Sequence, residues 1–158
     1  HLSSVNVLDT VIRHADLLRR WMPFFSHILH KSTLSDRDRE ILILRVGRLC
    51  GAEYEWSQHV RAARRVGMDD ADIRRVAVGT NADDWDPLGQ LLIRAVDELH
   101  ADDGLSDETW ALLTEHYSNA ELIDVVITVA GYRMVSIVLN SIGTQLEPDR
   151  PRFPDVRR

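Results

Sequence analysis

Apolar residues recur every three or four positions along almost the whole chain, which is the spacing of amphipathic helices. No stretch shows the sustained alternation of apolar and polar residues, bounded by turn signals, that is typical of a β-strand. The pattern therefore predicts an all-α protein. The expected helices cover residues 7–14, 16–30, 36 to near 51, 53–66, 69 to near 79, 88–100, 106–117 and 118 to about 144.

Several helix boundaries carry a recognisable signal. Ser118 and Glu121 are three residues apart, as in a capping box, and predict the start of the last helix. Gly67 is a good stop for the helix before it. Pro23 falls inside an apolar helical pattern, and we expect it to break that helix or to occupy a first turn.

The last predicted helix is apolar on nearly all sides, from Leu122 to Ile142. Asp124 and Arg133 lie within it, and amphipathic segments flank it, so the pattern favours a buried central helix over a membrane span. We therefore predict no membrane association.

Three prolines follow this helix, at positions 148, 151 and 154. They divide the chain into a helical domain, residues 1–146, and a Pro-rich extended tail, residues 147–158. A frayed terminus is the expectation for the tail.

Composition narrows the functional classes. The 158 residues fit one domain, and 44% hydrophobic residues suffice for a core. The formal net charge of -6 argues against nucleic-acid binding, which needs a basic surface. Cys50 is the single cysteine, so no disulfide can form within the chain. No pattern of a signal peptide is found, and a reducing, cytoplasmic location is the default expectation.

The densest group of polar residues lies between Glu40 and His59. Glu55 and His59 are four apart on one predicted helix and share a face. If that helix and the preceding one form a hairpin around Cys50-Gly51, Glu40 meets His59. A carboxylate beside an imidazole is a proton-transfer pair, because histidine titrates near neutral pH and the carboxylate fixes its tautomer. The alternative is a surface ion pair worth a few tenths of a kcal/mol.

Tyr54 and Trp56 flank Glu55 and offer walls for a planar unsaturated ring, or else simply core packing. Glu55 and His59 could supply two metal ligands, but no third ligand stands at a motif spacing, so we predict no metal. The sequence also lacks a glycine-rich phosphate loop and a Gly-x-Ser-x-Gly elbow, and we predict no cofactor.

Three segments of the chain resemble the core of carboxymuconolactone decarboxylase-like proteins, a family that includes the alkylhydroperoxidase D group. The segment Tyr54-Glu55-Trp56-x-x-His59 carries the most specific part, and supporting similarity extends from 17–21 to 140–143. The three segments are Asp38–Arg45, Ala52–Val60 and Ala63–Met68.

The peroxidase branch of this family is characterised by Glu, eleven residues, Cys, two residues, Cys, three residues, His. Glu40 and His59 match its outer residues, but the two cysteine positions hold Ala52 and Glu55. The histidine that often precedes the second cysteine is Tyr54. Peroxide reduction needs an attacking and a resolving thiol, so the resemblance implies that this chain has lost that activity.

What the resemblance implies is a single-domain helical bundle of the alkylhydroperoxidase D-like type, with a central helical hairpin and a long buried C-terminal helix. It also implies a cofactor-free lyase acting by acid/base chemistry on a small unsaturated carboxylic acid or lactone. In this hypothesis His59 is the general acid/base, Glu40 orients it or relays its proton, and Glu55 is a second acid/base group. Arg45 either grips a substrate carboxylate or forms a structural salt bridge, and Tyr132 either reaches the pocket or is core.

Three alternatives remain open at this stage. One is a thiol-dependent peroxidase through Cys50, which the missing cysteine pair disfavours. The others are an isomerase or cyclase, and a non-enzymatic oligomeric accessory protein on the same fold. The resemblance further implies a homo-oligomer, commonly a trimer or hexamer, and a small-molecule substrate as the other partner.

Overall fold

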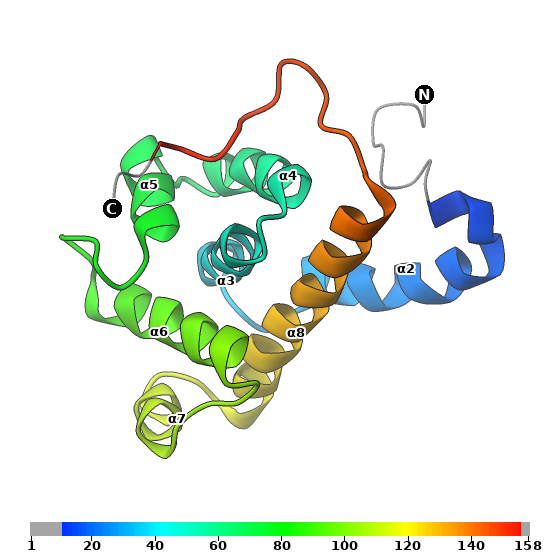
Figure 1. Ribbon diagram of the computed structural model, residues 1–158. Helices are drawn as coiled ribbons and strands as arrows, with labels where there is room; N and C mark the ends of the chain where they lie inside the picture. The colour runs from blue at the N-terminus through cyan, green and yellow to red at the C-terminus, as the bar shows by residue number, and fades with distance from the viewer. Residues whose placement is uncertain (1–10, 156–158) are drawn as a thin grey trace.

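A computed structural model describes residues 11–155 and shows an all-α chain in which no strand occurs within that range. Its elements confirm the predicted fold class (Figure 1). They are the 3-10 helix η1 (Ile12–His14) and the α-helices α2 (Ala15–His30), α3 (Asp36–Leu49), α4 (Glu53–Arg65), α5 (Asp70–Val78), α6 (Pro87–Ala101), α7 (Asp107–Thr114) and α8 (Asn119–Ile142).

The boundary signals read from the sequence mostly hold. Ser118 and Glu121 form a reciprocal capping box at the start of α8. Gly67 follows α4 with a φ of 91°, a left-handed conformation that favours glycine. Pro23 lies inside α2, so the prediction of a break or a first turn there is wrong. Residues 7–10 of the first predicted helix lie outside the described residues.

Helix α3 occupies the centre of the bundle, with α4, α5, α6 and α8 around it (Figure 1). Every residue from Asp38 to Gly47 is buried, including the charged Arg39, Glu40 and Arg45. Buried charges need opposite charges and hydrogen bonds close by. The most buried helix is therefore also the one whose charged side chains must be paired precisely by its neighbours.

The long C-terminal helix α8 packs against α2, α3, α4, α6 and α7. By length and composition it is the one helix among the described residues that could cross a membrane, and half of its most apolar window is buried inside the bundle. The face turned away from the bundle stays apolar. It exposes large side chains at five positions: Ile123, Ile127, Met134, Ile137 and Ile142.

The segment after α8 returns across the bundle to the α3–α4 hairpin (Figure 1). Phe153 is half-buried against Trp56, with ring centroids 5.4 Å apart, and the Arg48 guanidinium lies 4.7 Å from the Phe153 ring centroid. Arg152 adds an ion pair with Glu53 at 2.9 Å. Residues 147–155 contain no helix, but they are anchored by these contacts, so the expected fraying is not what the structure shows for them.

Candidate active site

The turn between α3 and α4 brings Glu40 and His59 together. Gly51 sits in this turn with a φ of 62°, which glycine tolerates without a steric cost, and the two helices run back along each other from it. His59 Nδ1 lies 2.7 Å from Glu40 Oε2. The hairpin thus joins two residues that are nineteen positions apart in the sequence.

His59 is held between two carboxylates. Its Nε2 lies 3.0 Å from Glu55 Oε1, one helical turn earlier on α4, while Nδ1 faces Glu40. Both ring nitrogens therefore meet acceptors, and only the doubly protonated imidazolium can donate to both. We call Glu40, His59 and Glu55 the carboxylate–imidazole triad.

Burial favours the neutral imidazole, but the charge and hydrogen bond of Glu40 and those of Glu55 outweigh it. Together they raise the pKa of His59 from 6.5 to about 10. All three side chains of the triad are nearly inaccessible to solvent. The triad therefore stores a proton in the protein interior at neutral pH.

Arg39 supports the triad from the side of α3. Its Nη2 lies 3.5 Å from Glu40 Oε1, and its Nη1 donates to Asp36 at 2.7 Å. The second oxygen of Glu40 is thus directed to Arg39 while the first accepts from His59. This arrangement fixes the Glu40 carboxylate in one orientation.

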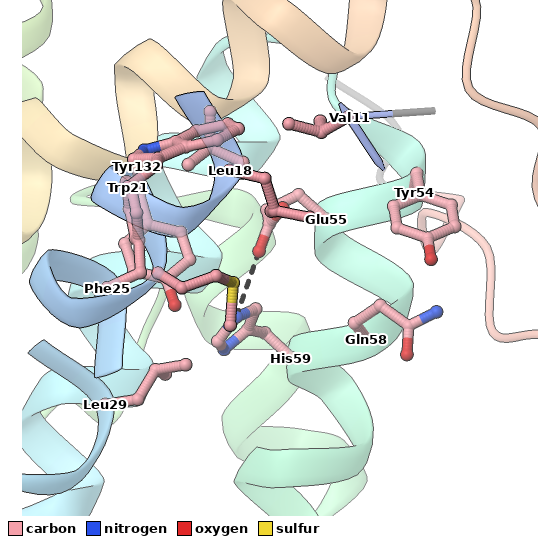
Figure 2. A pocket seen from close by; sticks show the side chains of 12 residues that line it. Val11, Leu18, Trp21, Phe25, Leu29, Tyr54, Glu55, Gln58, His59 and Tyr132 are labelled. Carbon is pink, nitrogen blue, oxygen red and sulfur yellow. Dashed lines mark ion pairs between the residues drawn. The ribbon is translucent and has the colours of Figure 1, made fainter. Parts of the chain in front are cut away.

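An apolar cavity of about 280 Å³ opens beside the triad (Figure 2). In Figure 2, Glu55 and His59 point from α4 toward the side chains of α2, among them Trp21 and Phe25. The walls come from α2, α4 and α8. The lining residues are Val11, Leu18, Trp21, Met22, Phe25, Leu29, Tyr54, Glu55, Gln58, His59, Tyr132 and Val135.

Within the triad, Glu55 and His59 line the cavity and Glu40 does not. Both nitrogens of His59 face carboxylates. Glu55 Oε1 also faces His59, and its Oε2 is the carboxylate oxygen of the triad that is directed neither to His59 nor to Arg39. Glu55 therefore meets the cavity with an oxygen free of His59, beside the His59 ring, and Glu40 lies behind them.

Two of the four other candidate residues also line the cavity. The rings of Tyr132 and His59 are nearly perpendicular, with centroids 4.9 Å apart. Burial raises the pKa of the Tyr132 hydroxyl, and the charges of Glu55 and Glu40 add to this effect. Tyr54 contributes from α4. The hydroxyl of Tyr132 is therefore a neutral group at neutral pH.

Trp56 and Arg45 lie elsewhere. Trp56 is 1% exposed and packs in the core against Phe153. Arg45 forms a two-pronged ion pair with Asp97, at 2.6 and 2.9 Å, and donates to the carbonyl oxygens of Val76 and Ala77. Its guanidinium is fully used in joining α3 to α5 and α6, so the structure does not bring it to the cavity.

Cys50 is also outside the cavity. It lies half-buried at the end of α3, with its Sγ 3.8 Å from His100 Nδ1. Burial raises the pKa of the thiol, against the lowering effects of Arg133 and Ser136. A thiol that is kept protonated is a poor nucleophile, and it stands apart from the triad.

Sequence reasoning missed the wall that α2 provides. Leu18, Trp21, Phe25 and Leu29 lie at helical spacing, and α2 was expected only as an amphipathic helix. That spacing identifies an apolar face, but nothing in it tells which other helix the face covers. Among residues 11–155, no cluster of three or more His, Cys, Asp or Glu side chains is arranged to hold a metal ion.

Comparisons with known proteins place this bundle in a class of all-α folds. A protein of unknown function from Agrobacterium tumefaciens, provisionally described as the antioxidant defence protein AhpD, superposes with a TM-score of 0.76 at 18% identity, over 83% of this chain and 90% of that one. An uncharacterized peroxidase-related protein from Silicibacter sp. TM1040 superposes with a TM-score of 0.75 at 13% identity, over 83% and 70%. At such identities the likeness concerns the fold alone.

The sequence itself gives the family. Residues 15–98 match the carboxymuconolactone decarboxylase family, and the chain belongs to it. The matched segment contains α2, α3 and α4, and so all three residues of the triad. No curated protein matches the chain.

Proposed function

We propose that the protein is a cofactor-free enzyme of the carboxymuconolactone decarboxylase type, which moves a proton at carbon in a small unsaturated lactone or carboxylic acid. The observation that carries this proposal is the triad: a buried imidazolium between two carboxylates, one of which faces an apolar cavity. Neighbouring groups that exchange one proton are the equipment of general acid/base catalysis.

We infer a division of roles that differs from the sequence hypothesis. Glu55, rather than His59, is the group that exchanges a proton with the substrate, because it lines the cavity and has an oxygen that is not directed at His59. His59 returns a proton to Glu55 through Nε2, and Glu40 holds the charge of the imidazolium through Nδ1. Glu40 is thus a positioning residue.

The chemical step needs no further reactant. When carbon dioxide leaves a lactone acid, the electrons of the broken C–C bond move into the lactone carbonyl system, and the resulting dienolate takes a proton at carbon. When a C–H bond is broken instead, Glu55 takes the proton and returns it to another carbon. In the decarboxylation the triad supplies one proton, which solvent restores. In the proton migration the triad holds the proton and gives it back.

The test compares wild type with Glu55→Gln and Glu40→Gln on γ-carboxymuconolactone and on a panel of unsaturated lactones. It follows carbon dioxide release and deuterium uptake from D2O by mass spectrometry. We expect Glu55→Gln to lose turnover by a factor of about 10² to 10⁴, the usual contribution of a positioned acid/base. Glu115→Gln, an exposed conservative control at the C-terminal cap of α7, keeps wild-type rates. Equal rates in wild type and Glu55→Gln would refute the proposal and favour a non-enzymatic protein.

We propose further that copies of the chain associate through the outer face of α8. Ile123 is 61% exposed and Ile137 58%, which is unusual for large aliphatic side chains gathered on one helix. Sedimentation velocity of wild type and of Ile123→Glu/Ile137→Glu checks this. A monomeric wild type would refute it, and so would an assembly that the substitutions leave unchanged.

A further inference from the structure

The side chains that line the cavity beside the triad are mostly uncharged. Its walls are apolar on the α2 and α8 sides, and none of its described lining residues is an arginine or a lysine. The cavity volume of about 280 Å³ lies just below the usual range for ligand sites, about 300–1,000 Å³. It therefore suits a small molecule whose surface is mostly apolar.

The positive charge of the triad, the His59 imidazolium, is already neutralised. Each N–H of the His59 imidazolium faces a carboxylate oxygen, at 2.7 and 3.0 Å, which leaves it no donor for a substrate carboxylate. Counted together, Glu40, His59 and Glu55 carry one negative charge. Arg39 of α3 is directed to Glu40 and Asp36 and does not line the cavity.

An anion that entered this cavity would lose its hydration and meet a carboxylate. Neither the lost hydration nor the repulsion by the carboxylate is compensated. Burial of a charge is favourable only when an opposite charge or several hydrogen-bond donors replace the water. An uncharged molecule pays neither cost. The electrostatics of the site thus discriminate between substrates of the same shape that differ in charge.

We propose that the substrate is an uncharged unsaturated lactone and that the reaction is the migration of its double bond, an isomerisation rather than a decarboxylation. This inference rests on the proposed function, since it uses the same triad. Glu55 removes a proton from the carbon next to the lactone carbonyl, and the C–H electrons form a dienolate. The protonated Glu55 then gives the proton to the far carbon of the dienolate, which restores the carbonyl and leaves a conjugated lactone with no net change in atoms or electrons.

The experiment compares two lactones of one shape. α-Angelica lactone is uncharged and β,γ-unsaturated, and its analogue carries a carboxymethyl group in place of the methyl group. Isomerisation is followed by the ultraviolet absorbance of the conjugated product. We expect kcat/KM to be at least about tenfold higher for the uncharged lactone, a modest discrimination for a missing counter-charge.

A matched pair of variants tests the cause of the discrimination. Leu18 lines the cavity and is half-buried on α2, while its neighbour Leu17 is 49% exposed and does not line it. Leu18→Arg should lower KM for the carboxymethyl lactone and reverse or abolish the preference. Leu17→Arg should leave the preference as in wild type.

The outcomes separate this inference from the proposed function. Faster turnover of the carboxymethyl lactone by wild type, lost in Glu55→Gln, would overturn the inference and uphold proton transfer by the triad. If wild type converts neither lactone, calorimetric titration decides. Tighter binding of the uncharged lactone would uphold the charge selection and refute the catalytic proposal, whereas equal binding would overturn both.

Discussion

Replacing His59 by glutamine should remove most of the pH dependence of folding stability on the alkaline side of neutrality. In the native protein the pKa of His59 is raised from 6.5 to about 10, because the carboxylates of Glu40 and Glu55 outweigh the effect of burial. A raised pKa means that the folded state binds the proton more tightly than the unfolded chain does. The resulting stabilisation is fully present below pH 6.5 and is lost as the pH rises toward 10.

The size of the effect follows from the same two values. The pKa of His59 rises from 6.5 to about 10, and each pKa unit corresponds to about 1.4 kcal/mol. The proton therefore contributes at most about 5 kcal/mol to the free energy of unfolding. That is a large part of the stability of an ordinary domain, about 5–15 kcal/mol. The His59→Gln variant leaves two carboxylates without the imidazolium, so it should be less stable than wild type near neutral pH, and the two proteins should converge as the pH approaches 10.

The assay is urea unfolding followed by far-UV circular dichroism at a series of pH values and one ionic strength. His116→Gln is the control, since His116 is exposed and its variant should follow the wild-type curve. Parallel curves for wild type and His59→Gln between pH 6.5 and 10 would refute the reasoning, because they would mean that the two carboxylates do not hold the imidazolium.

Three further substitutions test contacts outside the triad. Arg45→Ala should cost about 3 kcal/mol, because it leaves Asp97 without its two-pronged partner, and an unchanged melting temperature would contradict this role. Gly79→Ala should destabilise the fold by at least about 1 kcal/mol, because Gly79 has a φ of 91° and an added Cβ would overlap the Arg45 guanidinium. Thermal unfolding measures this loss, and an unchanged stability would be inconsistent with the close contact. Phe153→Ala should cost about 1–2 kcal/mol of packing and raise the solvent exposure of Trp56. The greater exposure should appear as a red shift and stronger iodide quenching of the tryptophan fluorescence. Unaltered emission would contradict the anchored tail.

The triad could be predicted from the sequence because its geometry is mostly local. Glu55 and His59 are one helical turn apart, and Glu40 meets His59 across a turn that Gly51 permits. Helical periodicity and a hairpin suffice for that inference. The division of roles within the triad was not accessible, since it depends on which oxygen faces the cavity.

Other features depend on packing between distant segments, which periodicity does not encode. Arg45 pairs with Asp97, 52 residues later, and nothing in the sequence distinguishes that partner from a substrate carboxylate. The apolar face of α2 was evident, but its role as the wall of the cavity follows from how α2 crosses α4 and α8. Trp56 was interpreted as core or wall, and the aromatic ring that covers it comes from the tail.

The tail also sets an order of events in the assembly of the fold. The tail joins Arg152 to Glu53, which lies 99 residues earlier in the sequence. Most of the chain lies between these two residues, so this contact closes a long loop. On the ribosome, Arg48 and Trp56 are synthesised about a hundred residues before the ring that covers them, and for that time Trp56 is an open aromatic surface on a nascent hairpin. We therefore expect the contacts of Phe153 to form after the bundle and to open before it. Amide hydrogen exchange should find residues 144–155 to be the least protected of the packed segments, ahead of any opening of α3.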